Sequence, residues 1–227
     1  MRHPGDNLRR ADWLVERIPH GEAVAAIRSW HYSKSAPNTG QTFGMFARAD
    51  YPMAPIAGVA LWLPPTRRAA EAVAGEAWEG VLSLSRLAVA PEMARNAATF
   101  LLARSMRLLD RDRWPVLVTF ADAAQGHSGA IYKATGWQLD GESTTGDYFI
   151  TPDGRQVGRK RGRHNHSAAD LIAAGCTRVK STKLRFVHRQ PEMTEGRTPR
   201  HPLQTDGTPE IYGHSVSTVT NRLDGAA

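Results

Sequence analysis

Three segments carry side chains whose types and spacing suit chemistry at one site. In the first, His31, Tyr32 and Ser33 follow one another directly after Trp30, where a predicted helix ends. Histidine supplies a base or a metal ligand near neutral pH, and tyrosine and serine supply hydroxyl groups. These side chains could line the edge of a site. The alternative is a helix end whose polar groups face water.

The second segment runs from Asp122 to Tyr132, ten residues further on. Asp122 ends an apolar stretch, a glycine-containing turn follows, and Tyr132 lies one turn into a short predicted helix. Sheets of α/β proteins bind ligands beyond the ends of their strands. We therefore expect Asp122 and Tyr132 to converge on one pocket. The alternative for Tyr132 is an aromatic residue of the core.

The third segment places Arg86 inside an otherwise apolar strand, with a helix starting near Asn96. A buried arginine requires a partner or a ligand. A helix N-terminus offers free N–H groups to an anion. The segment thus predicts an anion-binding element, and a structural ion pair of Arg86 with Glu92 or another acid is the alternative.

Apolar periodicity predicts the elements that must hold these residues. Together they indicate an α/β (α+β) three-layer domain over residues 10–152, with a mixed sheet flanked by helices. Asp12, Asn96 and Ser167 are candidate N-caps. The helices are expected at 12–30, 67–78, 96–111, 128–135 and 168–175. The strands are expected at 41–46, 56–63, 81–89, 114–120, 137–139, 148–150 and 183–188.

The positive charge is concentrated near the C-terminal end of the chain. The net charge is +7, and residues 155–189 hold ten lysines and arginines against one acid. Such an excess indicates a polyanionic partner, most often nucleic acid, with a solvated surface as the alternative. We expect a basic extension over 153–190, followed by a disordered tail over 191–227. Phosphate contacts are expected from Arg159, Lys160, Arg161, Arg163, Lys180 and Lys183.

Several classes of protein are excluded. No apolar run reaches the length of about 18 residues that a membrane helix needs. The N-terminus lacks the apolar core of a signal peptide. A single cysteine, Cys176, excludes an internal disulfide. We therefore expect a cytoplasmic protein without a membrane partner.

The segment Ile131–Trp137, after a strand and a turn, resembles the LYxxxGF helix of GCN5-related N-acyltransferases. The resemblance implies that Tyr132 protonates a departing thiolate of coenzyme A. It also implies a cofactor-binding set of Leu87, Val89, Asn96, Ala97 and Ser128. The segment Glu92–Ala98 lacks the two glycines of that family's pyrophosphate loop, which makes close backbone approach harder.

The longer string from Asp122 to Tyr132, with His31 to Ser33 upstream, resembles the phage Mom family. That family modifies adenine in DNA with a carbamoylmethyl group and blocks restriction enzymes. The resemblance implies a phage enzyme in the host cytoplasm. His31 or Asp122 would take the N6 proton. Tyr132 would serve the donor, Arg86 a developing oxyanion, and Tyr32 the base; Ser33 completes the catalytic set.

The donor of the two-carbon group stays open between an acyl-CoA and glycyl-tRNA, so DNA and possible tRNA are the expected partners. Relatives of this family suggest iron, with His31, Asp122 and Tyr132 as candidate ligands. Two alternative functions remain. An acyltransferase acting on a protein or small-molecule amine would explain Tyr132 but not the basic segment. A noncatalytic DNA-binding phage protein would explain the charge but not Asp122 and Tyr132.

Overall fold

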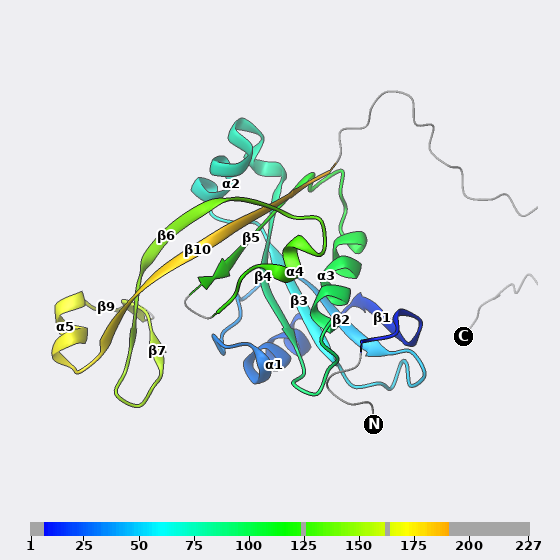
Figure 1. Ribbon diagram of the computed structural model, residues 1–227, viewed down its shortest axis with the longest axis horizontal. Coiled ribbons are helices and arrows are strands. Elements are labelled where there is room, and N and C mark those ends of the chain that lie inside the picture. Colours follow the sequence, from blue (N-terminus) through cyan, green and yellow to red (C-terminus); the bar gives the residue numbers. More distant parts are fainter. Residues whose placement is uncertain (1–6, 124–125, 162–163, 191–227) are drawn as a thin grey trace, which may run out of the picture. The chain divides into compact units, whose positions relative to one another are not determined.

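The computed structural model describes residues 7–123, 126–161 and 164–190. Its main sheet has eight strands in the order β1-β2-β3-β4-β5-β10-β6-β7, and all neighbours are antiparallel except β4 and β5 (Figure 1). Helices flank this mixed sheet, as expected. The strands are β1 (Trp13–Arg17), β2 (Gln41–Ala47), β3 (Gly58–Leu63), β4 (Val81–Val89), β5 (Val116–Asp122), β6 (Gln138–Ile150), β7 (Gln156–Val157) and β10 (Thr177–Arg189).

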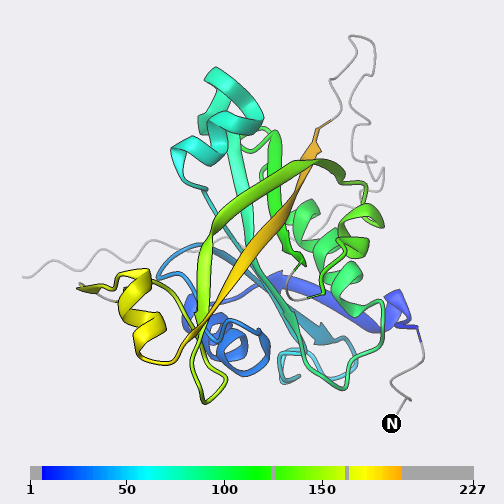
Figure 2. The same cartoon turned by 60° about the vertical axis from the view of Figure 1, so that its left-hand side comes forward.

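The helices pack on both faces of the sheet because successive apolar side chains of the buried strands point to opposite faces. In β3, Ala60 and Trp62 pack in the larger core with α3, whereas Val59 and Leu61 pack with Ile27 of α1 on the other face. Helix α2 covers that second face through a third cluster. Figure 2 shows the sheet between these layers. The helices are α1 (His20–Trp30), α2 (Arg67–Ala74), α3 (Ala97–Leu108), α4 (Ala130–Lys133) and α5 (Ala168–Ala173); 3-10 turns span Arg10–Asp12 and Gly75–Gly80.

Strands β4 and β5 separate along their length. They pair only where Val81–Ser83 meet Val116–Val118. Beyond that point β4 stays with β3 up to Val89, and β5 stays with β10 up to Asp122. The two strands therefore diverge, and a gap opens between their carboxyl ends.

The predicted helix over 12–30 is wrong at its first half. Residues 13–17 form β1, which pairs with β2, and α1 begins only at His20. Trp13 and Val15 alternate into the larger core, as a strand requires. Pro19 has no N–H for a strand ladder but suits the start of a helix. Asp12 consequently does not cap α1.

The two strands predicted at 137–139 and 148–150 form one strand, β6, which pairs with β10 from Val187 opposite Gln138 to Thr177 opposite Ile150. The residues expected to form a turn between these two strands are extended instead, because β10 pairs with β6 along the whole segment. Since β10 lies between β5 and β6, the sheet needs residues beyond 152, and the expected domain boundary there does not hold.

The rest of the basic extension sits at the far end of the β6–β10 ribbon (Figure 1). There β8 (Lys160–Arg161) and β9 (His164–Asn165) form a separate small sheet beside α5. Ser167 caps α5 with a reciprocal capping box, as predicted. The tail expected over 191–227 lies outside the described residues.

Candidate functional site

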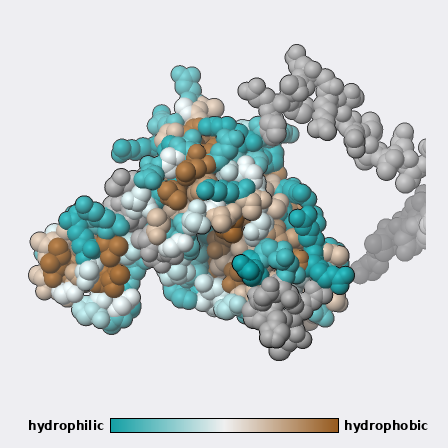
Figure 3. All heavy atoms as spheres, viewed as in Figure 1, coloured by the Kyte–Doolittle hydropathy of each residue, from teal (hydrophilic) through white to brown (hydrophobic). Residues whose placement is uncertain are grey.

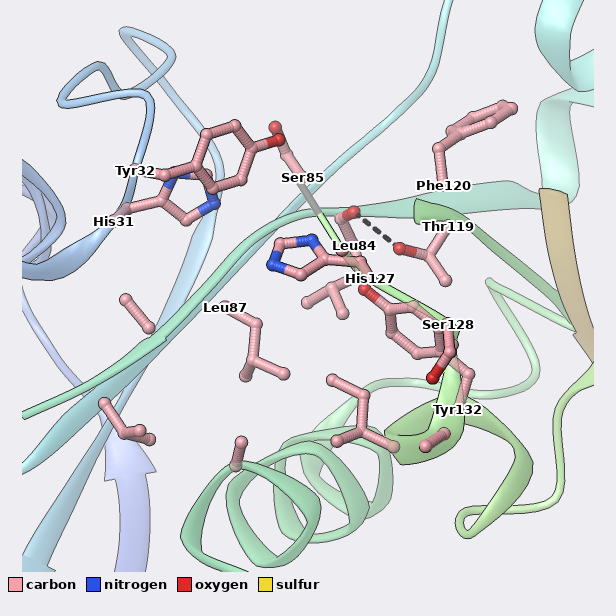
Figure 4. Close-up of a pocket in the computed structure, with 17 residues that line it drawn as sticks. His31, Tyr32, Leu84, Ser85, Leu87, Thr119, Phe120, His127, Ser128 and Tyr132 are labelled. Atoms are coloured by element: carbon pink, nitrogen blue, oxygen red, sulfur yellow. Dashed lines mark hydrogen bonds between the residues drawn. The ribbon is translucent and has the colours of Figure 1, made fainter. Parts of the chain in front are cut away.

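A hollow of about 330 Å³, called the strand gap below, lies between the diverging ends of β4 and β5 (Figure 4). Its walls come from β4, β5, the start of α3, the loop after α1 and the segment leading into α4. Its size falls within the range of small-molecule sites, about 300–1,000 Å³. The lining residues are His31, Tyr32, Leu84, Ser85, Leu87, Ala88, Val89, Ala98, Thr119, Phe120 and Gly126–Tyr132.

Tyr132 is held in the strand gap by the turn before α4. Gly129 has a φ of +76°, and a Cβ there would lie 2.1 Å from the Phe186 ring, so glycine is needed on both counts. The Tyr132 ring then packs 5.2 Å from Phe186 and 5.9 Å from Trp137, between ring centroids. Burial raises the pKa of Tyr132, which a hydrogen bond with Thr119 partly offsets. The phenol therefore stays protonated and can donate a proton.

His31 faces the strand gap from the end of α1. The backbone N–H of Ser33 donates to its Nδ1 over 3.1 Å, and the Ser33 hydroxyl lies 2.9 Å from that nitrogen. Burial, with Arg86, His127 and Lys34 nearby, lowers the pKa of His31 to about 4. A neutral imidazole whose Nδ1 accepts a hydrogen bond carries its hydrogen on Nε2. At neutral pH, His31 therefore donates a hydrogen bond from Nε2, and its lowered pKa makes it a weaker base than an exposed histidine.

Tyr32 is the point on which the polar groups converge. The His31 ring lies against it at 4.3 Å with a tilt of 31°, and His127 meets its ring edge-on at 5.5 Å, between centroids. Burial raises the pKa of Tyr32, Asp122 raises it further, and Arg86 opposes them. Asp122 is 3% exposed at the end of β5 and acts on Tyr32 from behind the lining. A buried carboxylate next to a phenol is an arrangement that can move a proton.

Figure 4 shows His31 and Tyr32 on one side of the strand gap and Tyr132 on the other. The structure thus brings Tyr132 together with the loop after α1, and it keeps Asp122 close behind Tyr32. Ser33 lies outside this lining, where its backbone and hydroxyl contact His31. The functional roles of these side chains remain predictions.

Arg86 does not line the strand gap. Its Nε donates to the Ser35 carbonyl over 2.7 Å, and its Nη1 donates to the carbonyl and hydroxyl of Ser85 over 2.8 and 3.2 Å. A register shift opposite Leu61 and Trp62 leaves Ser85 bulged out of the ladder, so Ser85 faces the gap and Arg86 turns away. Arg86 ties the loop after α1 to β4, which differs from both the ligand contact and the Glu92 pair considered above.

Some of the expected cofactor residues line the strand gap, and others do not. Leu87, Val89 and Ser128 line the strand gap. Asn96 instead accepts from the Leu8 backbone N–H over 2.6 Å without capping α3 by its side chain, and Ala97 is fully buried in the core. The N-terminus of α3 therefore does not present these two side chains to a ligand.

Sequence reasoning missed other lining residues, among them Ser85, Thr119 and His127. Thr119 donates from its hydroxyl to the Leu84 carbonyl over 3.2 Å, a bond that crosses from β5 to β4 at the start of the gap (Figure 4). A polar residue in the apolar stretch before Asp122 was the available signal. His127 was part of the string compared above, but nothing in its spacing indicated a contact with Tyr32.

The expected nucleic-acid residues that the structure describes lie in two parts of the chain. Arg159 donates to the His166 carbonyl over 3.3 Å, and Lys160 and Arg161 form β8. These residues belong to the part of the chain made of β8, β9 and α5 at the far end of the β6–β10 ribbon, called the distal lobe below. Lys180 and Lys183 lie in β10, where Lys183 is the direct partner of Asp122. Arg163 lies outside the described residues.

The expected iron ligands do not form a metal site. Within the described ranges, no group of three or more His, Cys, Asp or Glu side chains is placed to hold a metal ion. Nδ1 of His31 is already engaged by Ser33, and Asp122 does not line the strand gap with Tyr132. None of the helices in the described part of the chain has the length and apolarity of a membrane span.

Comparison with known proteins gives two kinds of match. The chain is similar to the ribosomal-protein-S18-alanine N-acetyltransferase from Escherichia coli, at 12% identity over 82% of this chain and 99% of that chain, with a TM-score of 0.49. It is also similar to an acetyltransferase from Bacillus subtilis in complex with CoA, at 10% identity over 78% and 99%, with a TM-score of 0.48. No curated protein sequence matches. The model of the Mom protein family matches residues 12–201, most of the sequence. The chain therefore belongs to the Mom protein family.

Proposed function

We propose that this protein is a DNA-modifying transferase that places a two-carbon group on the N6 amine of adenine, giving the carbamoylmethyl product. The observation that carries the proposal is the strand gap, where a protonated Tyr132 faces Tyr32 with the Asp122 carboxylate close behind. Tyr132 in the lining can give a proton, and the carboxylate behind the opposite side of the lining can take one. That is the requirement for transfer between a leaving group and an amine.

The lining favours a narrow acyl donor of the acyl-CoA type. Leu84, Leu87, Val89 and Ala98 give the strand gap an apolar wall that suits a thioester arm. The bond from N6 to the acyl carbon forms as the carbon–sulfur bond breaks. Tyr132 protonates the thiolate, and the N6 proton passes toward Asp122. N6-glycyladenine and N6-carbamoylmethyladenine are isomers, so a glycyl donor followed by rearrangement gives the final product. Glycyl-tRNA is the second donor to test.

DNA binding is assigned to the basic extension. The distal lobe around α5 stands off from the body, with hydrophilic and hydrophobic residues mixed on its surface (Figure 3). Arg159 and the backbone of β8 belong to this lobe, and Lys180 lies on the ribbon that leads to it. Cations of this kind bind phosphates and position a protein without reading sequence. An acceptor other than nucleic acid would not explain why ten lysines and arginines gather over residues 155–189.

Mass spectrometry of nucleosides from DNA coexpressed with the protein tests the proposal. A mass shift of deoxyadenosine that disappears in Asp122→Asn and Tyr132→Phe is expected, because each removes a proton-transfer group at nearly constant shape. Leu139→Phe, at an exposed position outside the strand gap, is the control. Purified protein supplied with glycyl-CoA or with glycyl-tRNA then separates the donors. Unshifted deoxyadenosine together with an acylated protein amine would instead support the alternative acyltransferase.

A further inference from the structure

The side chain that first receives the N6 proton must lie in the strand gap itself. A general base acts at about 3 Å from the proton that it takes, or through one water. The Asp122 carboxylate does not meet this condition, because it is 3% exposed and stands behind the lining. The lone pair of adenine N6 is delocalised into the ring, so the proton has to leave as the new bond forms. The first acceptor is therefore one of the lining residues.

Four titratable side chains line the strand gap among the described residues: His31, Tyr32, His127 and Tyr132. Burial raises the pKa of both tyrosines, so both phenols are protonated at neutral pH. On His31, Nδ1 accepts a hydrogen bond from the Ser33 backbone and Nε2 carries the hydrogen, so neither nitrogen offers a lone pair to the substrate. His127 is the remaining side chain of the lining with a ring nitrogen that can accept a proton.

The turn after β5 places His127 at the strand gap. Its backbone N–H donates to the Asp122 carbonyl over 3.3 Å, which fixes the residue next to the end of the strand. Gly126 and Gly129, on either side of this short segment, have φ values of +72° and +76°. Residues with a Cβ rarely adopt such angles, so the two glycines allow the course of the chain that presents His127.

The His127 ring lies between the two sides of the strand gap, with Tyr32 on one side and Tyr132 on the other (Figure 4). It meets Tyr32 edge-on at 5.5 Å, between ring centroids. His127 is exposed, so it can return a proton to solvent after each transfer. Asp122 is near enough to raise the pKa of Tyr32, and its negative charge therefore lies on the side where a His127 imidazolium would form.

We propose that His127 is the general base that takes the N6 proton inside the strand gap. The proposal rests on the proposed function and adds the residue that receives the proton first. The bond from N6 to the acyl carbon forms while the N6 proton moves to the ring of His127. The carbon–sulfur bond breaks, and Tyr132 protonates the thiolate; with a tRNA donor, the carbon–oxygen bond breaks and the ribose oxygen takes that proton. The imidazolium then releases its proton to solvent and the Tyr132 phenolate regains one, so both groups are restored.

Two substitutions separate a base from a packing role at this position. His127→Phe keeps a ring against Tyr32 but has no basic nitrogen, and His127→Ala leaves a space that a small base can enter. Both should slow transfer by about 100-fold or more, because a general base contributes on that order. The melting temperature and coenzyme A binding, measured by calorimetry, should equal those of the wild type, since His127 is exposed and is not part of the apolar wall.

Chemical rescue supplies a readout that a packing role would not change. The assay follows labelled glycine from glycyl-CoA, or from glycyl-tRNA, onto a single-stranded oligodeoxynucleotide with one adenine. Added 4-methylimidazole, imidazole and 4-bromoimidazole should restore His127→Ala in that order, which is the order of their base strength. They should not restore His127→Phe, whose ring fills the space. The matched control is Tyr132→Phe, which lacks the proposed acid instead of the base and should not be rescued either.

The outcomes separate the base from the proposed function. If either His127 variant modifies DNA at the wild-type rate, or if rescue does not follow base strength, His127 is not the base and the function stands. If the wild type labels a lysine-containing peptide but not DNA, and that transfer shows the same loss and rescue, the base stands and the DNA acceptor is wrong. If the wild type labels neither acceptor, or labels only the peptide without that loss, both proposals are overturned.

Discussion

Replacing Gly129 by alanine tests whether the turn before α4 positions Tyr132 through steric demand. A non-glycine residue in the left-handed region costs about 1–2 kcal/mol. The added methyl group would also lie 2.1 Å from the Phe186 ring, and overpacking a core costs about 1–3 kcal/mol. The free energy of unfolding should therefore fall by about 2–5 kcal/mol in Gly129→Ala. Urea denaturation, followed by circular dichroism, measures it.

Gly154 provides the matched control. Its φ is +81°, but a Cβ there would meet no atom within 4 Å, so Gly154→Ala should lose only the conformational part, about 1–2 kcal/mol. Pairing Gly129→Ala with Phe186→Leu should relieve the clash, and the double variant should lose less than the sum of the two single losses. If Gly129→Ala loses no more stability than Gly154→Ala, the ring contact does not constrain the turn and this reasoning is refuted.

Three further predictions follow from the site and the basic segment. The pKa of His31 is about 4 in the folded chain, against an ordinary value of 6.5, so the unfolded chain takes up the proton first as the pH drops. The free energy of unfolding should therefore fall between about pH 6.5 and pH 4. His31→Gln should remove that part of the loss in urea titrations at pH 7 and pH 5. Arg86→Ala should lower the melting temperature, since the hydrogen bond from β4 to Ser35 in the loop after α1 and two hydrogen bonds to Ser85 within β4 are lost; an unchanged melting temperature with lost modification would instead support a ligand contact. Alanine at four basic positions should weaken binding to duplex DNA for all sequences and flatten the slope of log affinity against log salt by up to roughly 3–4, whereas an unchanged slope would place the DNA contacts elsewhere. These positions are Arg159, Lys160, Arg161 and Arg163.

The local pattern of apolar and polar residues was sufficient to predict the elements whose conformation does not depend on pairing with a distant strand. The strand β3 was predicted correctly because burial on both faces leaves a continuous apolar run. The strand from Val81 to Val89 was also predicted correctly, because it is mostly apolar and Pro91 follows its end. Helix α3 was predicted with its apolar stripe, although its ends differ by a few residues. Ser167 was identified as a cap because its hydroxyl and the following Asp170 form a local pattern.

Long-range pairing explains the failures. The stretch of glycine, serine and threonine in the middle of β6 has turn composition, and it is extended only because β10 pairs with it from nearly forty residues away. Residues 13–17 are compatible with a helix until β2 provides a neighbouring strand. Neither partner can be identified from a local window.

The candidate site was predicted in its residues more than in its geometry. His31, Tyr32 and Tyr132 were selected for their chemistry, and they do line one hollow. The sequence could not show that Ser33 engages Nδ1 of His31, because that contact depends on the exact turn after α1. It also could not show the bulge at Ser85, which turns Arg86 away from the gap and toward Ser35.

The position of β10 has a consequence for how the protein is made. This strand fills the place between β5 and β6, so during synthesis the ribosome must deliver residues 177–189 before either neighbour has its partner. Until then β5, which carries Thr119 and Asp122, has an open edge on that side, and open strand edges invite pairing with other chains. A chain truncated near residue 152 should aggregate as it emerges, and co-expression with the missing strand as a separate peptide should restore soluble protein.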